Sequence, residues 1–306
     1  MRVLITGASG FVGGHLWPML RERHEVMTLG RRPLADSDRH FEGDLEDDRF
    51  LEVLSRAAPE AVIHLAALTD AELCEEQPAR AEASNAEASA RLASAVARSC
   101  ARFLLVSTDL VFDGTSAPYT ESDAAFPLSV YGRTKLAGER RAAATLGERA
   151  CVARLALLYG TRASLTSRPS FIERSVARAS RGERVVLFED EFRTPVYVED
   201  AASGLALLLE HPRPPALVHL GGPERCSRLE MGIQALSAFG ISTDLAEPSS
   251  RSSAGSRAPR PRDVSLSSSL AVAHGFRART LAEGLSTMRR EMERRGFMVG
   301  SENRGP

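Results

Sequence analysis

The first half of the chain alternates short, uniformly apolar runs with longer segments in which apolar residues recur at helical spacing. The short runs, rich in β-branched and aliphatic residues, predict strands at 3–6, 25–29, 61–65, 102–107 and 151–158. The longer segments predict helices that include 11–23, 79–99 and 128–144. Wholly apolar strands that alternate with helices are typical of a parallel sheet covered on both faces. The pattern therefore predicts a doubly wound α/β fold.

The alternation loosens after about residue 160. There we expect helices at 169–181, 199–210 and 280–295, and strands at 184–188, 193–198 and 216–220. Residues 248–262, rich in Ser, Pro and Arg, predict a loop, and 300–306 a frayed tail. We expect a cofactor-binding domain over 1–160, to which the chain returns around 193–222. Residues 161–306 then form mainly a smaller, mixed α/β substrate domain.

Composition and charge narrow the class of protein. Of the 306 residues, 43% are hydrophobic and 26% charged, which is ordinary for a globular protein. Lys plus Arg number 39 against 40 Asp plus Glu, and a net charge of −1 excludes a broad electrostatic grip on nucleic acid or an anionic membrane. The chain opens with MRVLITG, which resembles no targeting segment, and no apolar run approaches the roughly 18 residues of a membrane span. These features predict a cytoplasmic protein.

Cysteines and acidic runs predict no metal site. The acidic runs at 44–48 and 189–191 lack the spacing of metal ligands and are interpreted as solvated surface. The cysteines are far apart, share no metal-ligand spacing and predict buried thiols in a reducing compartment. They are Cys74, Cys100, Cys151 and Cys226.

A glycine-rich stretch joins the first predicted strand to the first helix. Glycine there permits a tight turn and close approach of the backbone to a pyrophosphate, which the N–H groups of the helix N-terminus then bind. Because it lies between a strand and a helix, this stretch predicts a dinucleotide site. The residues expected to contact the cofactor are Gly7, Ser9, Gly10, Phe11, Val12 and Gly13.

The end of the second strand indicates which nicotinamide cofactor is bound. It carries Arg31 and Arg32, with no carboxylate before Asp36. Arginine accommodates a ribose 2′-phosphate, whereas a carboxylate would bind a 2′-OH, so NADP(H) is favoured over NAD(H). Two solvated surface arginines remain the alternative. Asp44 and Leu45 meet the adenine or cap a helix, and the sequence leaves both readings open.

The predicted catalytic groups are Tyr131 and Lys135, four residues apart and therefore on one helix face. A nearby ammonium is expected to lower the pKa of a tyrosine, making proton transfer feasible near neutral pH. Thr108, at the carboxyl end of the fourth strand, is placed to hydrogen-bond a substrate carbonyl. Asn85 either orders a proton-relay water or is a plain amide on a helix surface.

These motifs resemble those of the extended short-chain dehydrogenase/reductases, and most closely the dTDP-4-dehydrorhamnose reductase group. The matching stretches cover nearly the whole chain in the right order. They are TGASGFVG at 6–13, Asn85, STDLVFDG at 107–114, YGRTKLAGE at 131–139, RTPVYVEDAA at 193–202 and RPRDVSLSSSLA at 260–271.

The resemblance implies roles for individual residues. Thr108, Tyr131 and Lys135 form the catalytic triad, and a turn at 64–67 lines the cofactor cleft through Leu65, Ala66 and Ala67, with His64 expected in the core. Asp109 is a candidate substrate contact, although a structural hydrogen-bond acceptor is the favoured reading. Arginines suit the phosphate oxygens of a substrate diphosphate, with solvated loop residues as the alternative. These arginines are Arg193, Arg257, Arg260 and Arg262.

One departure from the group limits the prediction. Leu110 stands where the group has an aromatic residue, and a leucine there also argues against a 4,6-dehydratase, which needs a carboxylate at that position. The favoured function is NADPH-dependent reduction of a nucleotide-linked 4-keto-6-deoxysugar, by a possible homodimer. Three alternatives remain: a ketoreductase of a non-sugar secondary metabolite, a nucleotide-sugar epimerase, and a non-catalytic NADP-binding regulatory subunit resembling that of methionine adenosyltransferase.

Overall fold

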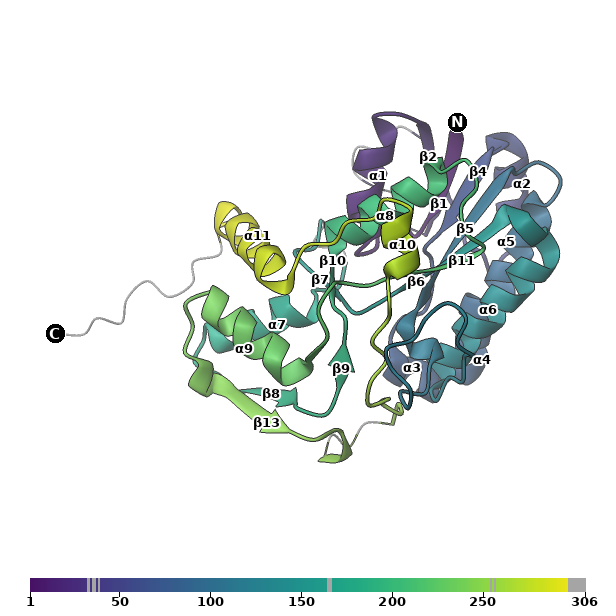
Figure 1. Cartoon of the computed structure of the whole chain (residues 1–306). Coiled ribbons are helices and arrows are strands. Elements are labelled where there is room, and N and C mark those ends of the chain that lie inside the picture. Colours follow the sequence, from purple (N-terminus) through teal and green to yellow (C-terminus); the bar gives the residue numbers. More distant parts are fainter. Residues whose placement is uncertain are drawn as a thin grey trace.

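A seven-stranded sheet, in which every neighbouring pair is parallel, forms the centre of the larger lobe (Figure 1). The computed structural model describes residues 1–31, 34, 37, 39–163, 167–253, 255 and 257–296. In spatial order the strands are β11 (Leu217–Leu220), β6 (Ala150–Leu155), β5 (Arg102–Thr108), β4 (Ala61–His64), β1 (Arg2–Thr6), β2 (Glu25–Gly30) and β3 (His40–Glu42). With helices on both faces, the predicted doubly wound fold is confirmed.

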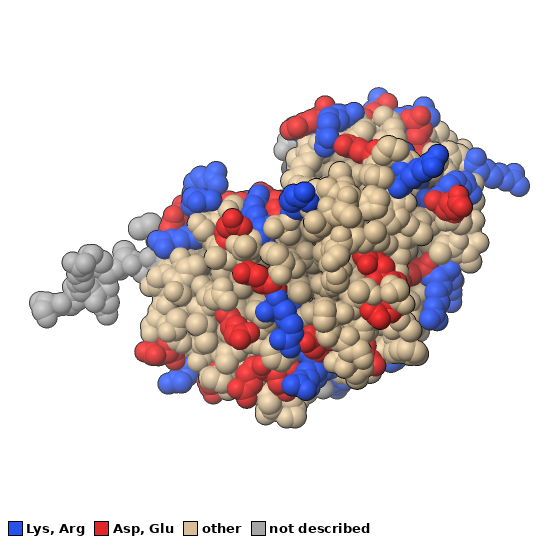
Figure 2. Space-filling view, in the orientation of Figure 1, with Lys and Arg blue, Asp and Glu red and all other residues tan. Residues whose placement is uncertain are grey.

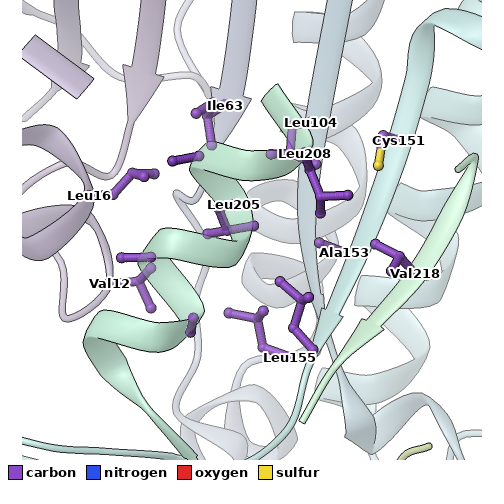
Figure 3. Close-up of a cluster of buried hydrophobic side chains, with 14 of the residues drawn as sticks. Val12, Leu16, Ile63, Leu104, Cys151, Ala153, Leu155, Leu205, Leu208 and Val218 are labelled. Atoms are coloured by element: carbon purple, nitrogen blue, oxygen red, sulfur yellow. The ribbon is translucent and has the colours of Figure 1, made fainter. Parts of the chain in front are cut away.

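Alternate residues of each central strand enter separate cores on the two faces of the sheet. On one face Val3 and Ile5 join a cluster with α1 (Gly13–Arg21) and α8 (Val198–Glu210). Figure 3 shows Leu205 and Leu208 of α8 reaching toward Leu104 and Leu155 of the sheet. Leu4, between Val3 and Ile5, faces the other core. That core is covered by α2 (Phe50–Ala57), α5 (Ala88–Val96) and α6 (Val130–Leu146).

The smaller lobe comes from the second half of the chain and has its own core, which includes Tyr159, Tyr197 and Phe239. Its helices are α7 (Phe171–Ala179), α9 (Arg228–Ala238) and α11 (Leu281–Arg294). Three short strand pairs complete it: β8 (Val185–Phe188) with β13 (Ala246–Ser249), β9 (Phe192–Arg193) with β12 (Cys226–Ser227), and β7 (Leu158–Tyr159) with β10 (Val196–Tyr197). The short helix α10 (Ser269–Ala273) packs near β11.

Several expected elements differ in detail. The helix expected over 79–99 is divided into α4 (Pro78–Glu82), a π-turn (Ala83–Glu87) and α5, and α3 (Ala71–Glu76) precedes it. The strand expected over 151–158 ends at Leu155 and resumes as β7, and that over 193–198 is divided between β9 and β10. The loop expected over 248–262 begins within β13, which pairs with β8. The expected tail at 300–306 lies outside the described residues.

The distribution of surface charge and the state of the cysteines agree with what the composition predicts. Basic and acidic side chains are interspersed over the face shown in Figure 2. The four cysteines are buried free thiols, as predicted. Among the helices that the structure describes, none has the length and hydropathy needed to cross a bilayer.

Candidate active site

The glycine turn between β1 and α1 lies at the carboxyl edge of the sheet. Gly7 has a φ of +72°, and a Cβ there would lie 2.7 Å from the backbone nitrogen of Ala66. Only glycine fits this close approach of two chain segments without strain. The first turn of α1 reads Gly-Gly-His-Leu from Gly13 and carries no acidic side chain that would repel a phosphate. The cradle fits a pyrophosphate.

The other residues of the turn divide between surface and core. Ser9, Gly10 and Phe11 are partly exposed, whereas Val12 is buried against the α8 side of the sheet. The Val12 side chain therefore packs in the core, and only its backbone lies at the turn.

Leu65, Ala66 and Ala67, all partly exposed, follow β4 at the same edge. His64, just before them, is completely buried between Thr6, whose Oγ1 is 2.6 Å from Nδ1, and Ser89, whose Oγ is 3.0 Å from Nε2. Burial, helped by the Lys135 ammonium, lowers the pKa of His64 to about 3. His64 is thus a neutral core histidine, as expected.

Asn85 anchors the segment after β4. It lies in the π-turn, 1% exposed, so the reading as a surface amide is wrong. Its Oδ1 accepts from Leu68 N at 2.7 Å, and its Nδ2 donates to Leu68 O at 3.1 Å and to Thr134 Oγ1 at 3.0 Å. These bonds tie the segment after β4 to α6.

Thr108 ends β5 and caps a short 3₁₀ turn (Asp109–Val111). Its Oγ1 donates to Asp109 Oδ1 at 3.1 Å and accepts from Leu110 N at 3.2 Å. Asp109 is 4% exposed. Burial raises the pKa of Asp109, although the Arg193 guanidinium opposes the shift.

Tyr131 enters the site from the first turn of α6, whose N-cap is Ser129. It is buried, in a cluster with Cys74 and beside Leu110. Burial, and then the Asp109 carboxylate, raises the pKa of Tyr131, while a hydrogen bond with Thr108 acts in the opposite direction. The expected lowering of this pKa is therefore wrong for the protein alone, because the tyrosine lies in an apolar cluster beside an acid.

Lys135 lies one turn further along α6 and is 4% exposed. Its Nζ donates to the backbone carbonyl of Val106 in β5 at 2.7 Å. Burial lowers the pKa of Lys135 to about 8, although the nearby Glu139 carboxylate opposes this. The carbonyl holds the ammonium at the same strand whose end carries Thr108.

A buried ion network adjoins Asp109. Arg193 Nε is 3.6 Å from Asp109 Oδ2, and Arg193 Nη2 is 3.1 Å from Glu191 Oε1. Arg228 Nε at 3.6 Å and Arg260 Nη1 at 3.5 Å also face the Glu191 carboxylate, which is 3% exposed. The interpretation of Glu191 as solvated surface is therefore wrong: three guanidinium groups surround it.

The remaining candidate arginines are not brought to this network. Arg257 is exposed, and its Nη1 is 3.2 Å from Glu76 Oε1 on α3. Arg262 is exposed, and its backbone carbonyl accepts from Phe192 N at 2.7 Å. The structure thus brings Arg193 and Arg260 together at Glu191, with only Arg193 facing Asp109, and leaves the other two at the surface.

Of the predicted cofactor-selecting residues, Arg31 is 72% exposed with its Nη1 3.9 Å from Asp44 Oδ2. Arg32 and Asp36 lie outside the described residues. Asp44 Oδ1 accepts from Glu46 N at 3.0 Å, which closes a local turn rather than capping a helix. Leu45 is buried in the core under α2.

Glu191 and Arg228 were missed by sequence reasoning. Strands β9 and β12 pair Cys226 with Arg193 and so bring the two segments together. Each strand is only two residues long, which is too short to show an alternation of apolar and polar residues in the sequence. Within the described residues, His, Cys, Asp and Glu form no group of three or more placed to hold a metal ion.

Known proteins resemble this chain along almost its whole length. Methionine adenosyltransferase 2 subunit beta of Xenopus tropicalis is 32% identical over 294 residues, which cover 91% of this chain and 84% of that protein. dTDP-4-dehydrorhamnose reductase of Streptomyces griseus is 34% identical over 210 residues, or 68% of this chain and 64% of that protein. The solved structure of MoeE5 in complex with UDP-glucuronic acid and NAD has a TM-score of 0.82 and 30% identity, covering 96% of this chain and 99% of that one.

The family model described as RmlD substrate binding domain matches residues 1–294. This match spans both lobes, including the glycine turn, the Thr108–Tyr131–Lys135 group and the arginine network. The chain therefore belongs to the RmlD substrate binding domain family, the dTDP-4-dehydrorhamnose reductase group of the extended short-chain dehydrogenase/reductases that the motifs predicted.

Proposed function

We propose that the protein is an NADPH-dependent reductase of a keto group on a nucleotide-linked 4-keto-6-deoxysugar. The observation that carries this proposal is that α6 packs Tyr131 against Leu110, two residues after Thr108, and holds Lys135 on Val106 O of β5, at the edge that also holds the Gly7 turn. Ligands of doubly wound folds bind at the carboxyl ends of the strands. The kinship with a dTDP-4-dehydrorhamnose reductase supports the sugar-nucleotide substrate.

In this mechanism the protein aligns the reactants and supplies a proton. The reduced nicotinamide, when bound, supplies a hydride for the carbonyl carbon. Tyr131 gives its hydroxyl proton to the carbonyl oxygen, which Thr108 also hydrogen-bonds. Lys135, held on Val106 O, would supply a positive charge to the cofactor and to the proton transfer from Tyr131. The arginines beside Glu191 bind the anionic diphosphate, for which planar guanidinium groups are suited.

The division of labour between the lobes is part of the proposal. Residues 1–160, with the return near 193–222, bind the cofactor, and residues 161–306 mainly bind the substrate. β11, from the return segment, completes the edge of the large sheet, which supports this division.

The direct test follows the loss of NADPH absorbance in the presence of a dTDP-4-keto-6-deoxysugar. We expect wild type to oxidise NADPH, and Tyr131→Phe to bind it with similar affinity but to reduce the sugar at least a hundredfold more slowly, because the proton donor is missing. Arg133→Ala, which removes an exposed side chain of the same helix turn, is the matched control. Full turnover by Tyr131→Phe would refute the mechanism.

The choice of NADP(H) has its own test. Arg31→Ala, alone and with Arg32→Ala, should weaken NADPH binding about tenfold while leaving NADH binding nearly unchanged, since only NADPH carries the 2′-phosphate that an arginine would meet. Fluorescence titration with both cofactors measures the two affinities. Equal losses for the two cofactors would overturn this preference.

A second candidate function rests on a specific likeness. One relative, which matches 91% of this chain, is a subunit of methionine adenosyltransferase 2. Under this reading the protein binds NADP without consuming it and regulates a catalytic partner. Co-purification with a methionine adenosyltransferase, together with unchanged NADPH across a panel of keto sugars, would favour this second function.

A further inference from the structure

The single proton of the Thr108 hydroxyl is already engaged. An ionised carboxylate can only accept hydrogen bonds, so the Thr108 hydroxyl donates its hydrogen bond to Asp109 Oδ1 at 3.1 Å. Leu110 N donates to the same hydroxyl oxygen from 3.2 Å. With Asp109 ionised, the Thr108 hydroxyl therefore offers no proton to a substrate carbonyl.

Asp109 sits where a change of protonation would matter. Its Oδ2 has no hydrogen-bond partner among the described residues and faces Arg193 Nε at 3.6 Å. The charged groups around it are Arg193 on β9, Glu191 just before β9 and Arg228 at the start of α9. Burial outweighs the arginines and raises the pKa of Asp109.

We propose that protonation of Asp109 reverses the hydrogen bond between Thr108 and Asp109 and so converts the site to the form that reduces a ketone. A neutral Asp109 donates to Thr108 Oγ1, which frees the Thr108 proton to point at Tyr131 or at a carbonyl oxygen. The neutral form also removes the negative charge that opposes loss of the Tyr131 proton. Asp109 is thus a positioning residue that acts through Thr108, and the proton it holds comes from solvent and is not consumed.

The reversal can be tested without substrate or cofactor. The chain has only four tyrosines, so a protein labelled with ¹³C at tyrosine Cζ gives few signals, and Tyr131→Phe identifies the one from Tyr131. In wild type we expect the Tyr131 signal to shift at a pH above the usual aspartate range of about 4, as Asp109 titrates. In Asp109→Asn this shift should be absent, because an amide does not ionise. A wild-type signal that stays constant from about pH 4 to about pH 9 would overturn the proposal.

The catalytic consequence rests on the proposed function and has a separate readout. Above the pKa of Asp109, single-turnover reduction by wild type should fall by about tenfold per pH unit. Asp109→Asn, whatever its absolute rate, should lack this fall, and the surface variant Asp123→Asn should keep it. The pKa of Lys135, lowered to about 8, affects all three proteins alike.

The two hypotheses fail in different ways. If wild type consumes no NADPH with any keto sugar, the proposed function fails, while the tyrosine signal still decides the reversal. If wild type reduces the sugar and Asp109→Asn has the same pH profile, the proposed function stands and the role of Asp109 is refuted.

Discussion

At the scale of single residues, burial determines the chemistry of the titratable groups around the site. His64, Lys135 and Tyr131 are all residue types that serve in acid–base catalysis. Burial shifts the pKa of each in the direction that favours its neutral form: down for His64 and Lys135, and up for Tyr131. The shift is largest for His64, which is completely buried and lies near the Lys135 ammonium. His64 therefore makes the free energy of unfolding depend on pH and does not act as a catalytic group.

His64 should make the protein less stable in mild acid. Its pKa is lowered to about 3 in the folded protein, whereas the unfolded chain binds this proton below about pH 6.5. The unfolded state thus binds more protons, and stability falls as the pH falls below 6.5. From pH 7 to pH 5 this amounts to about 2 kcal/mol.

Urea unfolding at the two pH values measures the effect. His64→Gln, which cannot ionise, should be less stable at pH 7 but should lose about 2 kcal/mol less than wild type on acidification. An equal slope in His64→Gln would contradict the assignment of His64 as a buried neutral side chain.

At the scale of elements, the π-turn holds the segment after β4 against α6. The extra residue in this turn places Asn85 so that its amide bonds both to Leu68 after β4 and to Thr134 on α6. Gly138 permits the close contact, since a Cβ there would lie 2.6 Å from Asn85 O. The segment that lines the glycine cradle is thereby fixed to the helix that carries Tyr131 and Lys135.

Asn85→Ala should destabilise the protein by about 2 kcal/mol, because Leu68 N and Thr134 Oγ1 lose a partner in a buried position. Ser84→Ala, a partly exposed neighbour in the same turn, should change stability by less than about 0.5 kcal/mol. Thermal unfolding of both variants measures the difference. A loss no greater than that of Ser84→Ala would show that the amide does not hold the two elements together.

The elements also show what a sequence can predict. The Gly7 turn, Thr108 at the end of β5 and the Tyr131–Lys135 spacing depend on local periodicity, and the structure brings them to one edge of the sheet. The π-turn was not predicted, because its residues have the same apolar spacing as a regular helix. The direction of the Tyr131 pKa shift was also missed, since it depends on Cys74 and Asp109, distant in sequence.

At the scale of the whole molecule, ion pairs connect the two lobes around α3. Arg257 Nη1 lies 3.2 Å from Glu76 Oε1, and Arg168 Nη1 lies 2.6 Å from Asp70 Oδ2. These pairs are exposed and each contributes little. The buried group around Glu191 differs, because solvent does not screen its charges.

Within the described part of the chain, the buried network leaves two guanidinium nitrogens without a partner. Arg193, Arg228 and Arg260 face the Glu191 and Asp109 carboxylates, and Arg260 Nη2 also lies 3.9 Å from Glu72 Oε1. Arg228 Nη1 and Arg260 Nε have no hydrogen-bond partner among the described residues. An anionic ligand would accept hydrogen bonds from these two donors.

Glu191→Gln tests this network as an anion site. Removing one partner of a buried ion group leaves the other charges uncompensated, so we expect a loss of at least about 3 kcal/mol in the free energy of unfolding. The matched control is Glu189→Gln, an exposed glutamate two residues away, which should lose less than about 0.5 kcal/mol. Because the variant network has lost one negative charge, inorganic pyrophosphate should raise its melting temperature more than that of wild type. If pyrophosphate stabilises Glu191→Gln no more than Glu189→Gln, the arginines around Glu191 do not form an anion site, and the diphosphate must bind elsewhere.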